Sequence, residues 1–132
     1  MGNQRNPDLK IVVVDDSDFS RKNIINILEK EGFNILGQAS SAEEGIKLSV
    51  TTDANLFIVD VVMPEKSGIE LVKTMTENSY KGYVIMTSSL TMENIVIESL
   101  SMGAVDFLKK PFNPDDLIKS VEKIEIQLER DK

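Results

Sequence analysis

Residues 56–64 read LFIVDVVMP, and this stretch carries the strongest indication of the fold. Its first four residues, Leu56 to Val59, are apolar without alternation, which is typical of a strand covered on both faces of a parallel sheet. Asp60 follows directly, and an unpaired carboxylate is costly at the end of a buried strand. The stretch therefore predicts a parallel sheet with a functional carboxylate at the end of one strand.

Strand and helix patterns alternate on both sides of this stretch. The strands are expected at residues 9–14, 33–39, 56–59, 82–87 and 104–108. A helix-starting residue follows each strand, and the expected N-caps are Ser17 or Asp18, Ser41, Ser67, Thr91 and Asn113. Regular alternation of this kind predicts an α/β fold, a doubly wound five-stranded parallel sheet with five helices on its two faces.

The length of the chain limits its domain organisation. With 132 residues, it is long enough for one compact domain and too short for two ordinary ones. No linker or change in composition divides the sequence. We therefore expect a single domain over residues 8–130, preceded by a flexible N-terminal arm at residues 1–7.

Two absences from the composition restrict the chemistry, because the chain has no cysteine and no histidine. Without cysteine there are no disulfides, so a reducing compartment is permitted and we expect a cytoplasmic protein. Without histidine, Ser-His-Asp and Cys-His catalysis and the usual zinc sites are excluded. A bound metal must then be held by carboxylate and carbonyl oxygens, which favours Mg²⁺, Mn²⁺ or Ca²⁺.

Charge and hydropathy restrict the partners. The net charge of −7 argues against direct binding of nucleic acid, whose phosphates recruit basic surfaces. No apolar run approaches the roughly 18 residues that a membrane span needs. We therefore expect neither nucleic acid nor a membrane as a partner.

Polar side chains gather where the predicted strands end. Asp15 and Asp16 follow the first strand, Asp60 the third, Thr87 ends the fourth, and Lys110 comes after the fifth. In the flavodoxin-like strand order 2-1-3-4-5, the first and third strands are neighbours, and ligands bind beyond their carboxyl ends. Three carboxylates so close repel one another unless a cation intervenes. The sequence therefore predicts a divalent cation site, with Mg²⁺ preferred and Mn²⁺ an alternative.

The same site suits a phosphoryl group. A metal ion can bridge a carboxylate and a phosphate oxygen, Lys110 offers a second positive charge, and the hydroxyl of Thr87 can donate a hydrogen bond. Because the chain has no cysteine, histidine or P-loop lysine motif, a carboxylate is the plausible covalent acceptor. The product would be an acyl phosphate.

Four motifs, taken together and in this order, resemble those of the response-regulator receiver family. The resemblance covers about residues 8–130 of this sequence. Single motifs of this kind are weak indications, whereas all four in register are very specific. The motifs are Asp15-Asp16, Asp60-Val-Val-Met-Pro with Gly68, Thr87, and Lys110-Pro111-Phe112.

The resemblance implies a site chemistry. Asp60 would accept a phosphoryl group from a sensor histidine kinase, and Lys110, rather than Lys109, would contact that group. The bond between Lys110 and Pro111 is expected to be cis, a form that proline makes accessible. The family's metal site implies that Mg²⁺ is bound by Asp16, Asp60 and the backbone carbonyl of Val62, with Asp15 in support.

The resemblance also implies a switch. Thr87 would turn toward the phosphoryl group and Phe107 would move inward, which would reshape the face of the fourth helix, fifth strand and fifth helix. Expected partners are the kinase and a downstream target protein or phosphatase, and the chain would be a monomer or a weak phosphorylation-dependent dimer. The chain would not be an enzyme for other substrates, but a phosphoacceptor that catalyses only its own phosphorylation and dephosphorylation. The chain would be a single-domain regulator of the chemotaxis type, with motility the favoured process by analogy alone.

Two alternatives remain. The chain could be the receiver part of a longer multidomain regulator, which the length of the full gene would decide. It could also be a flavodoxin-like cofactor binder or a metal-dependent phosphatase. A flavin binder needs a phosphate-cradling loop after the first strand, where Asp15 and Asp16 would repel phosphate without a metal. An aspartyl phosphatase needs a cap domain, for which this chain has no room.

Overall fold

The computed structural model of the chain describes residues 5–90 and 92–131. Five parallel strands form one sheet in the order β2-β1-β3-β4-β5, as predicted. The strands are β1 (Lys10–Val14), β2 (Asn34–Ala39), β3 (Leu56–Asp60), β4 (Tyr83–Ser88) and β5 (Asp106–Lys109). The helices are α1 (Asp18–Lys30), α2 (Ala42–Thr51), α3 (Gly68–Glu77), α4 (Glu93–Ser101) and α5 (Pro114–Arg130).

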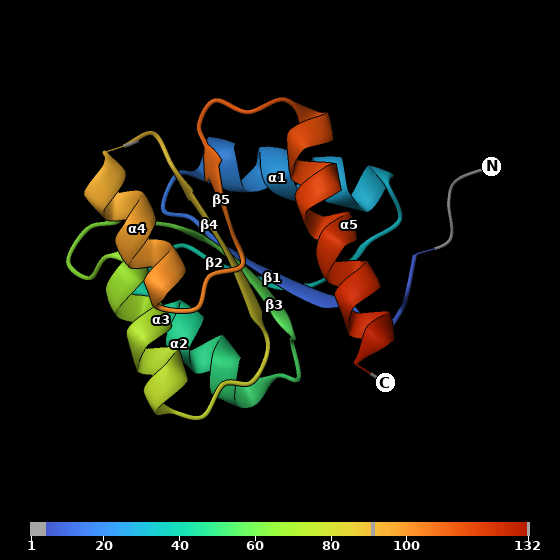
Figure 1. Ribbon diagram of the computed structural model, residues 1–132, viewed down its shortest axis with the longest axis horizontal. Coiled ribbons are helices and arrows are strands. Elements are labelled where there is room, and N and C mark those ends of the chain that lie inside the picture. The colour runs from blue at the N-terminus through green and yellow to red at the C-terminus, as the bar shows by residue number, and fades with distance from the viewer. Residues whose placement is uncertain (1–4, 91, 132) are drawn as a thin grey trace.

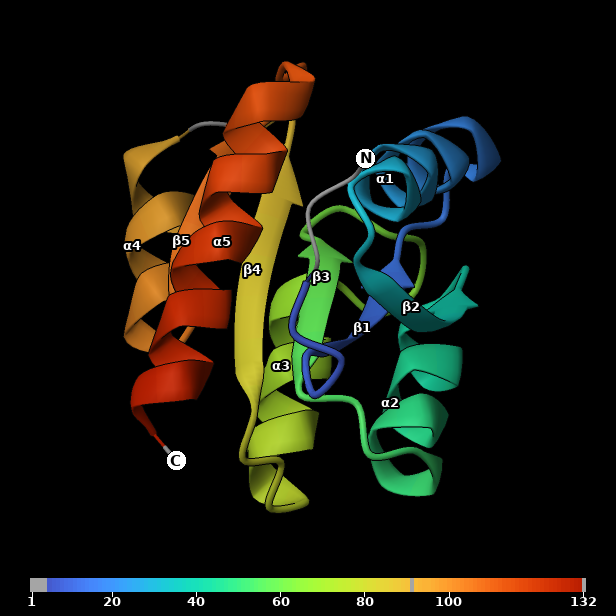
Figure 2. The ribbon, with the colours of Figure 1, turned by 90° about the vertical axis from the view of Figure 1, so that its right-hand side faces the viewer.

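The helices cover both faces of the sheet, with α1 and α5 on one face and α2, α3 and α4 on the other (Figure 1, Figure 2). Side chains from β1 divide between the two cores. Ile11 and Val13 belong to the core under α1 and α5, whereas Val12 and Val14 belong to the core under α2 and α3. Because both faces are covered, residues 11–14 of the strand are all buried, which explains the apolar run that follows Lys10.

The helix starts follow the local signals of the sequence. The side chains of Ser17, Ser41 and Ser67 each accept a hydrogen bond from the backbone N–H three residues later. The expected N-caps Ser41 and Ser67 are confirmed, and of the two candidates at the first helix the cap is Ser17 rather than Asp18. At α5 the cap is reciprocal, since Asn113 and Asp116 each bond the other's backbone N–H. No helix in the described part of the chain combines the length and apolar character that a membrane crossing requires.

The start of α4 differs from the other helix starts. Thr91, the expected N-cap, lies outside the described residues, and the N-cap position is Met92. Its side chain makes no capping hydrogen bond. This helix therefore begins without the stabilisation that a serine, threonine, aspartate or asparagine would supply.

The N-terminal segment is anchored at Arg5, although we expected a flexible arm there. Residues 1–4 lie outside the described residues. The Nε atom of Arg5 donates to the carbonyl of Glu31 at 3.0 Å, and its Nη1 atom donates to Glu122 at 2.9 Å. The guanidinium lies 4.5 Å from the ring centroid of Phe33. Arg5 thus ties the end of α1 and the start of β2 to α5.

Candidate functional site

The three carboxylates predicted to share a cation site lie together. Val14 and Val59 are paired in the register of β1 and β3, so Asp15 and Asp60 leave the sheet side by side. One oxygen from each of Asp15, Asp16 and Asp60 lies within 4.8 Å of the others. Asp15 and Asp60 are buried, whereas Asp16 is exposed. The site is therefore a pocket of negative charge with one side open to solvent.

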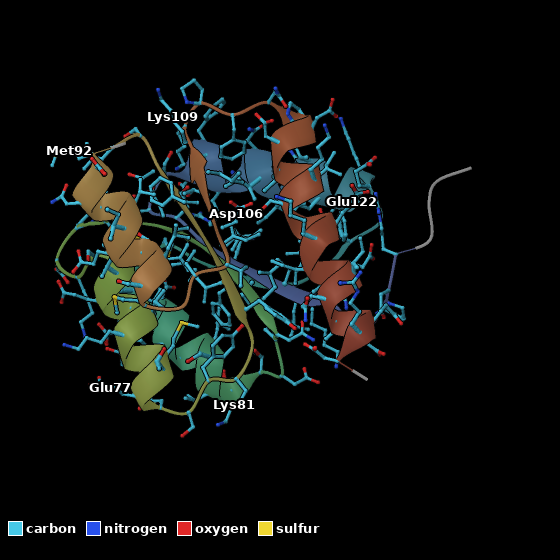
Figure 3. All side chains as sticks on the ribbon, in the orientation of Figure 1. Glu77, Lys81, Met92, Asp106, Lys109 and Glu122 are labelled. Atoms are coloured by element: carbon cyan, nitrogen blue, oxygen red, sulfur yellow. The ribbon has the colours of Figure 1, made fainter. Side chains whose placement is uncertain are left out.

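Lys110 enters this pocket from the connection between β5 and α5. Its Nζ atom lies 2.7 Å from Oδ2 of Asp15 and 3.0 Å from Oδ2 of Asp60. Its backbone N–H donates to the carbonyl of Ser88 at 2.8 Å, and its bond to Pro111 is cis. Lys109 is exposed at the end of β5 (Figure 3). Of the two lysines, Lys110 is the one that contacts the carboxylates.

The charges in the pocket are not balanced. Burial raises the pKa of the Asp60 carboxyl, and Lys110 opposes this rise only in part. Burial by itself would lower the pKa of Lys110, but the hydrogen bond to Asp15 and the charge of Asp60 outweigh it, so this pKa is raised. Lys110 therefore stays protonated at neutral pH. One ammonium group faces three carboxylates, which leaves an excess of negative charge for a further cation.

Thr87 and Phe107 lie on neighbouring strands beside the pocket. Thr87 is paired with Asp60 in the register of β3 and β4. Its hydroxyl oxygen is buried and has no hydrogen-bond partner within the described part of the chain. Phe107 is paired with Met86 across β4 and β5 and is half-buried against the core under α2 and α3. An unpaired buried hydroxyl next to Asp60 is a donor available to a group bound there.

The loop after β3 folds closely around Asp60. The backbone N–H of Val62 donates to Oδ1 of Asp60 at 3.1 Å, while the Val62 side chain is about half exposed. The backbone N–H of Gly68 donates to the carbonyl of Val61 at 2.8 Å. A Cβ atom at Gly68 would lie 2.2 Å from the carbonyl oxygen of Asp60. This close approach explains why the motif contains glycine at that position.

Two α1 residues that were not predicted from the sequence also contact the site. The hydroxyl of Ser20 donates to Oδ2 of Asp15, and Nη1 of Arg21 donates to the carbonyl of Asp15, both at 2.7 Å. Arg21 is buried on the same helical stripe as Ile24 and Leu28. A charged residue at a core position of an amphipathic helix is the signal that could have revealed it.

The donor set fits a hard divalent cation. Carboxylate oxygens such as those of Asp16 and Asp60 are the ligands that Mg²⁺ prefers. Asp15 already accepts hydrogen bonds from Ser20 and Lys110 at the same oxygen. Asp16 and Asp60 are therefore better placed than Asp15 to hold a cation directly.

Comparison with known proteins agrees with this arrangement. A family model for the response regulator receiver domain matches residues 11–122. The chain belongs to that family. Its receiver domain is 31% identical over 114 residues to the chemotaxis protein CheY of Bacillus subtilis strain 168, and the match covers 86% of this chain and 95% of that one.

Solved receiver structures share the fold. A CheY-like receiver domain protein from Methanospirillum hungatei JF-1 has a TM-score of 0.87 and 25% identity, over 98% of this chain and 100% of that one. A structure of the CheX-CheY-BeF₃-Mg²⁺ complex from Borrelia burgdorferi matches with a TM-score of 0.82 and 30% identity, over 88% of each chain. The predicted family and fold class are thereby both confirmed.

Proposed function

We propose that this receiver domain is a two-component signalling switch in which Asp60 accepts a phosphoryl group from a sensor histidine kinase. The observation that supports this most directly is the position of Lys110, whose ammonium group bridges Asp15 and Asp60 at 2.7 and 3.0 Å. A cation fixed at that place can neutralise a phosphoryl group on Asp60. Asp16 completes the cluster on the exposed side.

In the proposed reaction, a carboxylate oxygen of Asp60 forms a bond to phosphorus. The bond between phosphorus and the imidazole nitrogen of the kinase breaks, and its electron pair stays on that nitrogen. Oδ1 of Asp60 is oriented by the N–H of Val62, and Oδ2 faces Lys110. The free hydroxyl of Thr87 is a donor for an oxygen of the phosphoryl group. Val62, Lys110 and Thr87 thus position and neutralise the reacting groups.

Asp16, Asp60 and the carbonyl of Val62, with Asp15 in support, would hold Mg²⁺, or Mn²⁺ in its place. When bound, the ion would supply positive charge for the oxygens of the phosphoryl group. The Mg²⁺ in the Borrelia burgdorferi complex supports this assignment for the present chain.

We further propose that phosphorylation is relayed through Thr87 and Phe107 to the face formed by α4, β5 and α5. Phe107 is half-buried and lies next to Met86, so it can take a more inward position if neighbouring side chains move. The partners would be a histidine kinase and a downstream target or phosphatase, with chemotaxis the favoured process by similarity to CheY. The protein would act in the cytoplasm, as a monomer or a weak phosphorylation-dependent dimer.

Incubation with acetyl phosphate and Mg²⁺, followed by intact mass measurement, tests the proposal. We expect a gain of one phosphoryl group in the unaltered protein. The gain should be lost in Asp60→Asn and when Mg²⁺ is removed with EDTA. Asp53→Asn is the matched control, because Asp53 is an exposed aspartate whose carboxylate pairs with Lys10 and not with Lys110. A phosphoryl group that is retained by Asp60→Asn would rule out Asp60 as the acceptor.

A further inference from the structure

Asp15 is held by the first turn of α1. Its Oδ1 atom accepts from the backbone N–H of Ser17 at 2.9 Å. Its Oδ2 atom accepts from the hydroxyl of Ser20 and from the ammonium group of Lys110, each at 2.7 Å. Arg21 donates to the backbone carbonyl of Asp15 at 2.7 Å. Ser20 and Lys110 therefore share one oxygen of a carboxylate that the rest of the turn keeps in place.

Lys110 is divided between two carboxylates, because it contacts both Asp15 and Asp60. To neutralise a phosphoryl group on Asp60, it must loosen its contact with Asp15. Asp15 is only 1% exposed, so water cannot readily replace a lost donor. Leaving a buried charged group without a donor is costly. The hydroxyl of Ser20 is the donor that remains on Oδ2 when Lys110 moves away.

We propose that Ser20 is a positioning residue that controls how strongly Asp15 retains Lys110, an inference that rests on the proposed function. With the hydroxyl in place, Oδ2 keeps one donor, and Lys110 can follow the phosphoryl group. Without it, Oδ2 of Asp15 has Lys110 as its one remaining donor among the described residues and holds the ammonium group more tightly, while Oδ1 keeps its bond from the N–H of Ser17. The negative charge of the carboxylate cluster is then also offset by one hydrogen-bond donor fewer, so the cluster attracts a divalent cation more strongly.

Ser20→Ala should therefore have two effects of opposite sign. The dissociation constant for Mg²⁺ should fall by roughly threefold, because the cluster loses a compensating donor. The rate of phosphorylation at saturating Mg²⁺ should fall by about tenfold or more, in line with the loss of one hydrogen bond to a charged group. A merely structural role would weaken metal binding and phosphorylation together, and would not separate them.

Acetyl phosphate serves as the donor in this experiment. The Asp60 oxygen bonds to phosphorus, the bond between phosphorus and the acetyl oxygen breaks, and its electron pair leaves with acetate. The rate is read by intact mass. The affinity for Mg²⁺ is read by calorimetry, because the chain has no tryptophan to report binding by fluorescence.

Two further variants make the experiment specific. Ser20→Thr keeps the hydroxyl and should restore both the affinity and the rate to those of the unaltered protein. Asn23→Ala changes an exposed residue one turn further along α1, which lines one pocket together with Ser20 and Lys110, and should leave both unchanged.

The outcomes separate this inference from the proposed function. If Ser20→Ala behaves like Asn23→Ala, or if it weakens both Mg²⁺ binding and phosphorylation, the role of Ser20 is overturned while the proposed function stands. If the unaltered protein neither binds Mg²⁺ nor gains a phosphoryl group, the proposed function itself fails, and the role of Ser20 fails with it.

Discussion

Asp60 is a buried carboxylate that the fold tolerates at a cost. Burial raises its pKa above the ordinary value of 3.8, so ionising it costs more in the folded than in the unfolded state. Asp60→Asn removes the charge and keeps the shape, and should raise the free energy of unfolding by on the order of 1 kcal/mol at pH 7. Urea unfolding in EDTA, which keeps metal binding out of the comparison, would measure this gain.

The sign of the pH dependence follows from the raised pKa. The cost of ionised Asp60 is fully present above its folded pKa and disappears as the pH falls below 3.8, where the group is neutral in both states. The gain from Asp60→Asn should therefore be largest near neutral pH and vanish in acid. A gain that stays constant across this range would contradict the assigned cause. Asp53→Asn, at an exposed carboxylate, should change stability little.

Gly68 has a steric requirement that can be tested against a second glycine. Gly68→Ala should destabilise the domain by about 1–3 kcal/mol, because the new Cβ would overlap the carbonyl oxygen of Asp60. Gly37→Ala is the matched control, since a Cβ there would meet only Leu48 and Val12 side chains at ordinary contact distances. Thermal unfolding of both variants would measure the difference. Equal stability of the two would contradict the crowding at Gly68.

At the scale of single elements, α4 and α5 begin in opposite ways. Asn113→Ala should lower the free energy of unfolding by about 1 kcal/mol, because α5 loses its reciprocal cap with Asp116. Met92→Ser should raise the free energy of unfolding by roughly 0.5–1 kcal/mol, because α4 gains a side-chain cap at an exposed position. Chemical unfolding of the two variants should show shifts of opposite direction. Shifts in the same direction would mean that tertiary packing outweighs the caps.

Helix starts are set by residues close together in the sequence, whereas strand ends are set by distant ones. Ser41 and Ser67 were identified as caps from the sequence, and Ser17 as one of two candidates, because the bond joins residues only three positions apart. Strand ends were less well predicted, and β3 extends to Asp60 rather than ending at Val59. The residue at which a strand ends depends on whether it pairs with a residue of the neighbouring strand. Here Asp60 pairs with Thr87 of β4, which is distant in the sequence.

For the whole molecule, a cation bound at the carboxylate cluster should stabilise the folded state. The cluster joins residues from two strands and exists only when the sheet has formed, so Mg²⁺ should bind the folded chain in preference to the unfolded one. At a concentration 100 times the dissociation constant, the expected stabilisation is about 2.7 kcal/mol. Thermal unfolding with Mg²⁺ and then with EDTA would show a reversible shift. The shift should be smaller in Asp60→Asn, and an equal shift would place the cation elsewhere.

The sequence alone was sufficient for the architecture and for the three carboxylates that lie together at the site. Strands covered on both faces are mostly apolar, and the apolar runs at residues 11–14 and 56–59 therefore identify β1 and β3 and their order in the chain. The carboxyl ends of parallel strands meet at one edge, which is why Asp15, Asp16 and Asp60 could be brought together before any coordinates were known.

The partners of each side chain needed the folded chain. Lys110 contacts Asp15 across 95 residues of sequence, and Arg5 contacts Glu122 across 117. The donors that Ser20 and Arg21 present to Asp15 also depend on how α1 is oriented against the sheet. Backbone patterns repeat along the chain and can be read locally. A contact between particular side chains depends on the packing angle and separation of distant elements, and the whole core sets these.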